Sequence, residues 1–241
     1  MSQTKLPKIL AFDVFGTVVD WRTSIARESA VFLPRVGLKD VDPEAFTDAW
    51  RIRYIGAMAA FRDSQRSFAS LDILHREMLD DVLRDAGAAP ESLDAELLDD
   101  WNRSWHRLDA WPDSVAGLTR LKAMFPIITL TNGNVALMLA MARRAGLPWD
   151  ALLGAEFTRA YKPDPRAYLG TVEALGISPN ELCLVASHHS DLAAARACGL
   201  QTAYVNRPQE YGEGIAPDAN AKQDWEWCTD SIADLADQLG C

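Results

Sequence analysis

Cysteine is scarce in this chain of 241 residues, and the four cysteines are Cys183, Cys198, Cys228 and Cys241. No two of them have the close spacing of a zinc or redox motif. A chain of this length can also bury enough apolar surface to fold without disulfide bonds. The sequence therefore predicts four free thiols and argues against a disulfide-stabilised secreted domain.

The sequence also lacks long apolar runs and an excess of basic residues. No stretch approaches the roughly 20 apolar residues of a membrane span, and residues 1–8 lead into a strand without a signal-type apolar region. Lys and Arg number 24 against 34 Asp and Glu, which gives a formal charge of -10. Such a surface repels nucleic-acid phosphates and anionic lipids. We expect a cytoplasmic protein that binds neither nucleic acid nor membranes and binds an anionic substrate only in a locally positive pocket.

Short apolar runs alternate with helical patterns over most of the chain, which is typical of βαβ units and a parallel sheet. Residues 206–230, rich in Gly, Pro and polar residues, are predicted to be a long surface connection without a clear role. The fold class predicted is α/β, a Rossmann-like parallel sheet core with helices on both faces. The expected strands are 9–12, 127–131, one near 153, 182–186 and 202–205, and the expected helices begin near 113, 134, 165, 190 and 231.

Residues 21–106 interrupt this alternation with helical periodicity and no convincing strand. They predict an inserted α-helical cap subdomain, and residues 1–20 and 107–241 then form the core domain. One helix starts at Asp42-Pro43, a second starts after Ser70 and stops at Gly87, and a third spans about 91–106. The apolar stripe of the first helix comprises Phe46, Trp50, Tyr54, Ala57 and Phe61.

Asp13 directly follows the first apolar run and precedes a glycine turn. The carboxyl ends of parallel strands are where ligands bind in open α/β sheets, so a carboxylate there can act as a nucleophile or a base. The alternative is that Asp13 only caps the turn through its own backbone.

Two other segments place polar groups at the same edge of the sheet. The strand 127–131 ends in Thr131-Asn132-Gly133-Asn134, which predicts either an anion site at a helix N-terminus or an Asn cap with a glycine turn. Lys162 stands in a turn stiffened by Pro163 and Pro165, although most lysines are solvated.

The last strand-to-turn segment carries His188, His189 and Asp191. Asp191 is interpreted either as a helix cap or as a carboxylate that is catalytic or pairs with a lysine. Adjacent histidines point in different directions and do not form a metal pair by spacing. On the helical segment, either Arg51 or Arg53 can lie beside the buried face of the helix, and the sequence does not distinguish them.

The ordered set of these motifs resembles the haloacid dehalogenase superfamily, and within it the type II (S)-2-haloacid dehalogenases. The resemblance covers nearly the whole chain. It is carried by Phe-Asp-Val-Phe-Gly-Thr-Val-Val-Asp at 12–20, Trp-Arg at 50–51, Leu-Thr-Asn-Gly-Asn at 130–134, Tyr-Lys-Pro-Asp-Pro at 161–165 with Tyr168, and Ser-His-His-Ser-Asp-Leu at 187–192.

The resemblance implies a two-step mechanism. Asp13 displaces halide from the substrate carbon with inversion, and water then hydrolyses the aspartyl ester to release a 2-hydroxy acid. Lys162 is implied to hold Asp13 ionised, and Asp191 to pair with Lys162 or activate the water. Implied positions for the halide, the substrate carboxylate or support of the nucleophile are Arg51, Asn132, Thr17, Thr131 and Tyr168, with Phe15 as the turn aromatic.

Departures from related patterns refine the hypothesis. Phosphatases of the superfamily carry an acid two positions after the nucleophile and an acidic pair at the last motif, whereas this chain has Phe15 and Ser190 there. The sequence therefore favours dehalogenation with no metal and no cofactor. His188 stands where type II enzymes commonly have asparagine, so it is a candidate for orienting Asp191 or the water, or for marking another substrate.

The leading hypothesis is thus an enzyme that hydrolyses small anionic 2-haloacids. The candidate substrates are haloacetates and L-2-halopropionates, with fluoroacetate as a further candidate. The resemblance also implies a homodimer. Two alternatives stay open at this point. One is a magnesium-dependent phosphatase of the same fold, and the other is a binding protein without turnover.

Overall fold

The computed structural model describes residues 5–62, 66–212, 214 and 216–241. Contacts divide the chain into a core unit, formed by Met1–Asp20 and Asp109–Cys241, and a helical unit, Trp21–Leu108. The helical unit extends two residues past the boundary expected from the sequence. The reason is local, because Arg107 bonds Glu28 and Asp100 of that unit.

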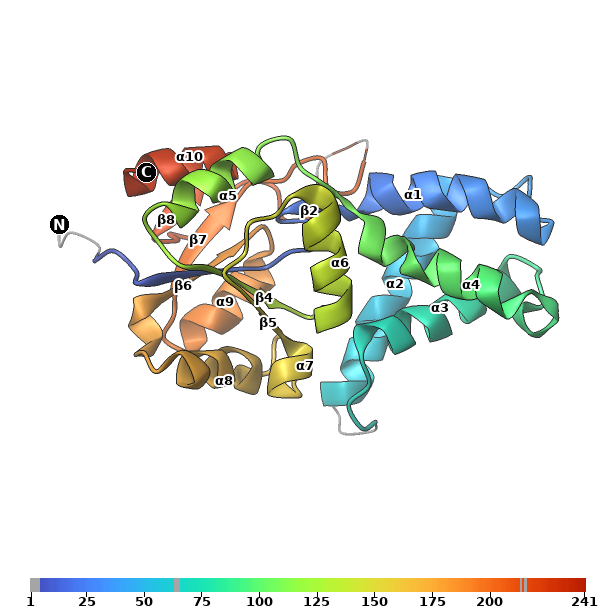
Figure 1. Cartoon of the computed structure of the whole chain (residues 1–241), viewed down its shortest axis with the longest axis horizontal. Helices are drawn as coiled ribbons and strands as arrows, with labels where there is room; N and C mark the ends of the chain where they lie inside the picture. Colours follow the sequence, from blue (N-terminus) through green and yellow to red (C-terminus); the bar gives the residue numbers. More distant parts are fainter. Residues whose placement is uncertain (1–4, 63–65, 213, 215) are drawn as a thin grey trace. The chain divides into compact units, whose positions relative to one another are not determined.

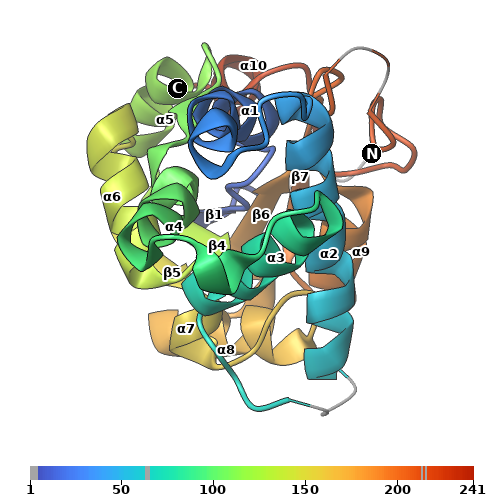
Figure 2. The ribbon, with the colours of Figure 1, turned by 90° about the vertical axis from the view of Figure 1, so that its right-hand side faces the viewer.

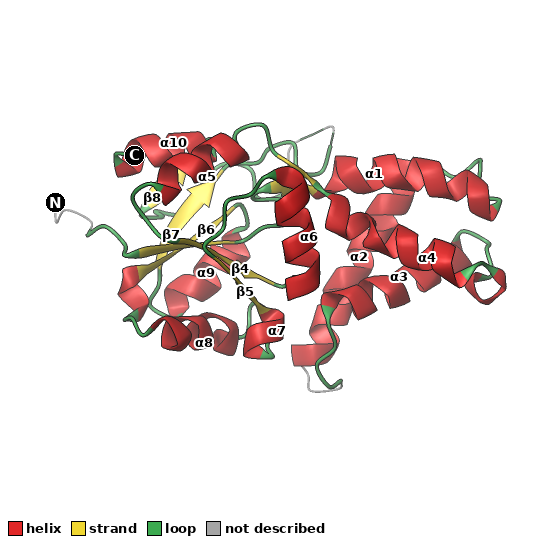
Figure 3. Ribbon diagram, viewed as in Figure 1, coloured by secondary structure: helices red, strands yellow, loops and turns green. Residues whose placement is uncertain are grey.

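The core unit is built on a six-stranded sheet in the order β5-β4-β1-β6-β7-β8, with every neighbouring pair parallel. Figure 3 shows these strands at the centre of the unit. A short antiparallel pair, β2 (Val19–Asp20) and β3 (Asp109–Ala110), lies in the same unit. The sheet strands are β1 (Ile9–Phe12), β4 (Ile127–Thr131), β5 (Ala151–Gly154), β6 (Leu182–Ala186), β7 (Gln201–Val205) and β8 (Trp227–Thr229).

Helices cover both faces of this sheet, so the predicted fold class is confirmed. On one face α5 (Ser114–Lys122) packs against α10 (Ile232–Leu239), and on the other α8 (Pro165–Leu175) packs against α9 (His189–Ala197) (Figure 1). The remaining α-helices of this unit are α6 (Val135–Ala145) and α7 (Ala155–Thr158), which contact β5.

Strand β1 lies at the point where the strand order reverses. From β1 the chain builds β4 and β5 on one side, then returns to build β6, β7 and β8 on the other. Such a reversal opens a crevice at the carboxyl ends of the strands, where ligands bind in open α/β sheets. Asp13, the first residue after β1, is therefore placed at the centre of the expected ligand site.

The segment 206–230, predicted to be a surface connection without a role, is partly buried and partly a strand. It contains β8 at the sheet edge, and the side chains of Glu210 and Trp225 are buried. The prediction was wrong because three residues are too few to show a strand period, and because no local pattern distinguishes a buried glutamate from a solvated one.

The helical unit comprises α1 (Trp21–Phe32), α2 (Pro43–Arg62), α3 (Leu71–Asp85) and α4 (Ala95–Asn102), shown in Figure 2. The helix predicted over 91–106 is instead a short helix between two 3-10 turns, Pro90–Ser92 and Arg103–Arg107. It starts late because Asp94 accepts a bond from the backbone of Glu96 and so caps it.

Stacked aromatic rings form the core of the helical unit. Phe46 and Trp50 of the predicted stripe are buried, whereas Tyr54, Ala57 and Phe61 are only partly buried. Fully buried Trp101 stacks on two rings, with centroid distances of 5.3 Å to Phe32 and 5.1 Å to Phe46. Ring stacking thus joins three of the helices.

We expect Trp101→Ala to lower the free energy of unfolding by about 3–5 kcal/mol, because it leaves a large cavity between stacked rings. Urea unfolding followed by circular dichroism measures this. Ile73→Ala, which truncates a side chain that is 50% exposed in the same unit, is the control and should change stability by roughly 0.5 kcal/mol or less. Equal effects of the two changes would contradict the role given to the aromatic cluster.

The cysteines at positions 183, 198, 228 and 241 are free thiols, as predicted. Among the described residues, no helix is both long enough and apolar enough to cross a membrane.

Candidate active site

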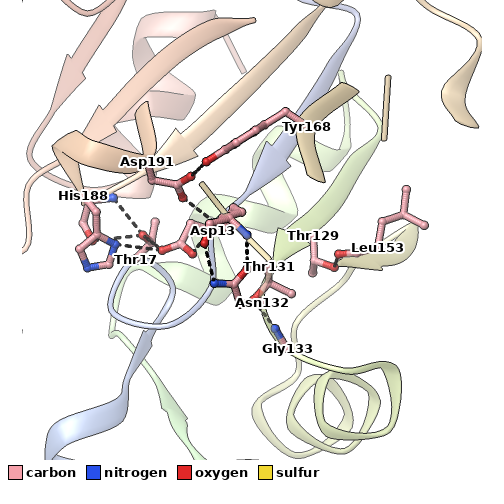
Figure 4. Close-up of polar contacts among 12 residues, drawn as sticks. Asp13, Thr17, Thr129, Thr131, Asn132, Gly133, Leu153, Tyr168, His188 and Asp191 are labelled. Atoms are coloured by element: carbon pink, nitrogen blue, oxygen red, sulfur yellow. Dashed lines mark hydrogen bonds and ion pairs between the residues drawn. The ribbon is translucent and has the colours of Figure 1, made fainter. Parts of the chain in front are cut away.

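Asp13 lies at the carboxyl end of β1 with 7% of its surface exposed. Its backbone N–H still bonds Val185 of β6, so the sheet fixes the residue up to this point. The chain then turns at Gly16, where φ is +84°, and returns the Thr17 hydroxyl to Asp13 Oδ2 at 2.8 Å. Ser187 donates its backbone N–H to the same hydroxyl at 2.9 Å. Asp13 is therefore a fixed, buried carboxylate that receives side-chain hydrogen bonds (Figure 4).

Lys162 joins two carboxylates at this edge of the sheet. Its Nζ donates to Asp13 Oδ1 at 2.9 Å and to Asp191 Oδ2 at 2.5 Å. These three residues are separated widely in the sequence, and their buried side chains converge because their segments follow β1, β5 and β6 at one edge. The structure therefore brings together the lysine and the two acids named from the sequence.

Charge and burial act in opposite directions on this cluster. Burial alone raises the pKa of Asp13, but the charge of Lys162 and the hydrogen bond from His188 outweigh it and hold that pKa well below the usual value of 3.8. Burial lowers the pKa of Lys162, but the charges of Asp13 and Asp191 raise it above 10.5. An ionised Asp13 next to a protonated Lys162 is a carboxylate in the state that a nucleophile needs.

Asp191 lies in the first turn of α9, and its carboxylate bonds side chains instead of capping the helix. Oδ2 accepts from Lys162, and Oδ1 accepts from the Tyr168 hydroxyl at 2.6 Å. Burial raises the pKa of the Tyr168 hydroxyl, and the nearby charge of Asp191 raises it further, so the hydroxyl stays a donor. In this structure Tyr168 supports Asp191 and contacts the nucleophile only through it and Lys162.

Thr131 ends β4, and Asn132, which follows it, positions the turn that carries Lys162. The side-chain oxygen of Asn132 accepts from the Lys162 backbone N–H at 2.8 Å, and the Thr131 hydroxyl accepts from the Gly133 backbone at 3.2 Å. Asn134 is at the N-cap position of α6, but its side chain makes no capping bond there. The halide-side role implied for Asn132 stays a prediction, whereas its bond to the Lys162 backbone is a direct observation.

His188 lies between Asp13 and a carboxylate that the sequence did not reveal. Its Nδ1 is 3.2 Å from Asp13 Oδ2, and its Nε2 is 3.0 Å from Oε1 and 3.1 Å from Oε2 of Glu210. Burial lowers the pKa of His188, but the charge of Glu210 and the bond to Asp13 raise it well above 6.5. These contacts thus favour the imidazolium form of His188. Its partner Glu210 was missed in the sequence because a single glutamate in a polar segment carries no motif.

Phe15 and Arg51 complete the set named from the sequence. Phe15 is buried, with 6% of its surface exposed, in the turn after Asp13. Arg51 belongs to the helical unit, where its guanidinium lies over the rings of Trp21 and Tyr54 at 5.3 and 4.5 Å. Arg53 pairs with Asp85 in the same unit. The role of Arg51 on the halide side stays a prediction.

A divalent cation would need several oxygen ligands at this site. Within the part of the chain that the structure describes, no group of three or more His, Cys, Asp and Glu side chains is arranged to hold a metal ion. Asp13 and Asp191 instead share the ammonium group of Lys162. The cluster can thus hold one carboxylate ionised with side-chain cations alone.

Comparisons with known proteins agree on the family. Residues 7–199 match the haloacid dehalogenase-like hydrolases. The chain is 33% identical to (S)-2-haloacid dehalogenase 1 of Pseudomonas sp. (strain CBS-3) over 210 residues, covering 83% of this chain and 86% of the relative. It is 28% identical to the phosphoglycolate phosphatase of Chromobacterium violaceum over 247 residues, covering 96% of each chain.

Among solved structures, the crystal structure of a defluorinating L-2-haloacid dehalogenase is similar along almost the whole chain. The TM-score is 0.95 and the sequence identity 48%, with 98% of this chain and 96% of the other covered. The similarity therefore extends over both the core and the helical unit of the chain.

Proposed function

The chain belongs to the haloacid dehalogenase-like hydrolases, and from this we propose that it hydrolyses the carbon–halogen bond of short 2-haloalkanoic acids. The products are 2-hydroxy acids and halide. The substrate class comprises haloacetates and L-2-halopropionates, with fluoroacetate included because a solved relative at 48% identity is described as defluorinating. Asp13, Lys162 and Asp191 are the proposed catalytic residues.

The observation that carries this proposal is the state of Asp13. Its carboxylate is buried and ionised beside Lys162 and His188. A phosphatase of this fold needs a second acid to protonate its leaving group, and a phenylalanine stands at that position, two residues after Asp13. A carboxylate in such a site can attack carbon without an acid partner, because a departing halide needs no proton.

In the first step an Asp13 oxygen attacks the carbon that bears the halogen. The carbon–oxygen bond forms as the carbon–halogen bond breaks, and the bonding pair leaves with the halide. Because attack is from the back side, the configuration at carbon inverts. Lys162 orients the attacking carboxylate through its 2.9 Å contact, and Thr17 holds the other oxygen.

In the second step water hydrolyses the aspartyl ester. The water oxygen bonds to the Asp13 carboxyl carbon, and a water proton passes to Asp191, which Tyr168 and Lys162 hold in place. The bond between this carbon and the ester oxygen then breaks, and the proton is returned to the leaving 2-hydroxy acid. The second water proton leaves the Asp13 carboxyl group for solvent, so Asp13 regains its charge with one oxygen from water.

We expect halide release from chloroacetate, fluoroacetate and L-2-chloropropionate in the presence of EDTA, because the proposed steps use only side chains of the protein. Ion chromatography measures the halide. After repeated turnover in heavy-oxygen water, peptide mass spectrometry should find the label in Asp13. Label that enters only the product would contradict the ester mechanism, and no halide from any substrate would reject the proposed function.

The phosphatase relative makes generic phosphate esters the matched control substrates. Phosphate release that EDTA abolishes, without halide release, would favour the magnesium-dependent phosphatase. Absence of both activities in a folded protein would favour a binding protein of this fold. The homodimer, the cytoplasmic location and the function of the helical unit as a cap stay predictions.

A further inference from the structure

The imidazole ring of His188 lies between two buried carboxylates. One ring nitrogen contacts Asp13 Oδ2 at 3.2 Å, and the other contacts both Glu210 oxygens at 3.0 and 3.1 Å. The Glu210 side chain is only 2% exposed and that of His188 18%. A neutral imidazole has one N–H, so its second nitrogen would direct a lone pair at a carboxylate oxygen. Both contacts are satisfied only if both nitrogens carry protons.

The surroundings of Glu210 are shaped to hold its carboxylate at this place. A Cβ added at Gly16 would lie 2.1 Å from Glu210 Oε1, so the turn after Asp13 has room for Glu210 only because residue 16 is glycine. The Glu210 backbone N–H bonds the Arg207 carbonyl. Arg207 is itself anchored by two bonds to Asp113 and by one to the Thr17 carbonyl. The contact between Glu210 and His188 is therefore built into the turn that positions Asp13.

The two oxygens of Asp13 have different environments. Oδ2 accepts from the Thr17 hydroxyl and faces His188 Nδ1, so donors occupy both of its lone-pair directions. Oδ1 accepts from Lys162. An oxygen whose lone pairs are both engaged is a poor nucleophile, so Oδ1 is the oxygen that attacks carbon. Oδ2 then becomes the carbonyl oxygen of the ester.

Resting on the dehalogenase function proposed above, we propose that the Glu210 and His188 pair serves the second step, where the His188 Nδ1–H stabilises negative charge on Asp13 Oδ2. When the water oxygen bonds to the carboxyl carbon, the π electrons of the ester carbonyl move to Oδ2. A positively charged donor already in contact with that oxygen lowers the energy of this intermediate. The carbonyl re-forms as the bond to Oδ1 breaks, and the product leaves with Oδ1. His188 keeps its proton throughout, and Glu210 is a positioning residue that holds the ring and its charge.

This role predicts that His188→Ala slows ester hydrolysis more than ester formation. We expect a rapid burst of about one halide per active site, followed by steady-state release slowed about 10²-fold, the usual cost of losing one such donor. Intact-protein mass spectrometry during turnover should then show the ester accumulating on Asp13. His188→Asn restores a neutral donor and should recover part of the steady-state rate.

The alternatives have distinct signatures in the same experiment. If His188→Ala slows the burst as much as the steady state and no ester accumulates, His188 acts in the first step and the proposal is overturned. If the wild-type protein releases no halide at all, the proposed function fails, and this outcome is recognised before any variant is compared. Thermal unfolding by circular dichroism, with Glu210→Gln measured beside His188→Ala, identifies a variant that has simply failed to fold.

Glu210→Gln tests the positioning role through the pH profile. The charges that face His188 are those of Glu210 and Asp13, with Lys162 and Asp191 behind Asp13. Glutamine still accepts a bond from Nε2–H but carries no charge, so His188 should lose its proton at lower pH. The alkaline fall in turnover should move to lower pH in this variant and stay unchanged in Glu173→Gln, which alters an exposed glutamate on α8. An unchanged profile in Glu210→Gln, or turnover that rises as His188 deprotonates, would overturn the proposal.

Discussion

Asp13→Asn should abolish halide release, with turnover reduced by roughly 10⁵-fold or more, the scale seen when an enzyme loses its covalent nucleophile. The amide is nearly isosteric with the carboxylate, but it carries no charge and its nitrogen has no lone pair available to attack carbon. It also directs N–H donors toward Lys162 or toward Thr17 and His188, which are themselves donors to Asp13. The reaction thus loses its nucleophile while the backbone bond of residue 13 to Val185 is kept.

Steady-state halide release is the measurement, with peptide mass spectrometry to verify that residue 13 remains asparagine. Asp150→Asn is the matched control, because Asp150 also lies at a strand end and accepts a backbone bond, from Ile127, but pairs with exposed Lys122. It should keep activity within about twofold, since surface pairs contribute about 0–1 kcal/mol. Similar losses in the two variants would show that the effect of Asp13→Asn arises from altered folding.

The sheet could be predicted from the sequence because its signals are local. Runs such as 127–131 and 182–186 are apolar over their whole length and are bounded by turns, which is enough to identify buried parallel strands. Strand β8, only three residues long, gave no such signal. The helix expected over 91–106 starts later than predicted because Asp94 accepts a bond from the Glu96 backbone and caps it. One side-chain hydrogen bond thus decides where the helix begins.

The convergence of Asp13, Lys162 and Asp191 could be anticipated for a topological reason. Their segments follow parallel strands, and the carboxyl ends of such strands meet at one edge. Which donor faces which oxygen could not be anticipated. Asn132 bonds the backbone of Lys162, and Tyr168 bonds Asp191, and these orientations depend on packing across the sheet.

Glu210 shows the limit of sequence motifs most clearly. It follows β7 within a polar segment, and only the folded chain shows its carboxylate packed on Gly16 and bonded to His188. The replacement of asparagine by histidine at position 188 could be noticed in the sequence. The charge of the His188 ring depends on Glu210, 22 positions away, and no sequence pattern connects the two residues.

Lys162→Met is the second change with a large expected effect, about 10³-fold in kcat/KM. Methionine has a similar length but no charge, so Asp13 and Asp191 are left close together and buried without the cation they share. Removing one partner of a buried ion pair also costs about 3–5 kcal/mol of stability. Both losses have the same cause, which is uncompensated carboxylate charge.

The pH profile separates this cause from a general loss of structure. In the wild-type protein the charge of Lys162 is the leading influence that holds the pKa of Asp13 low, against burial, which raises it. Without that charge the pKa of Asp13 rises. Because activity needs the ionised form, the acid limb of the pH profile should lie at higher pH in Lys162→Met than in the wild type. Lys122→Met removes an exposed lysine paired with Asp150 and should leave the profile unchanged. An acid limb at the same pH in Lys162→Met and in the wild type would show that Lys162 does not set the ionisation of the nucleophile, whatever the loss of rate.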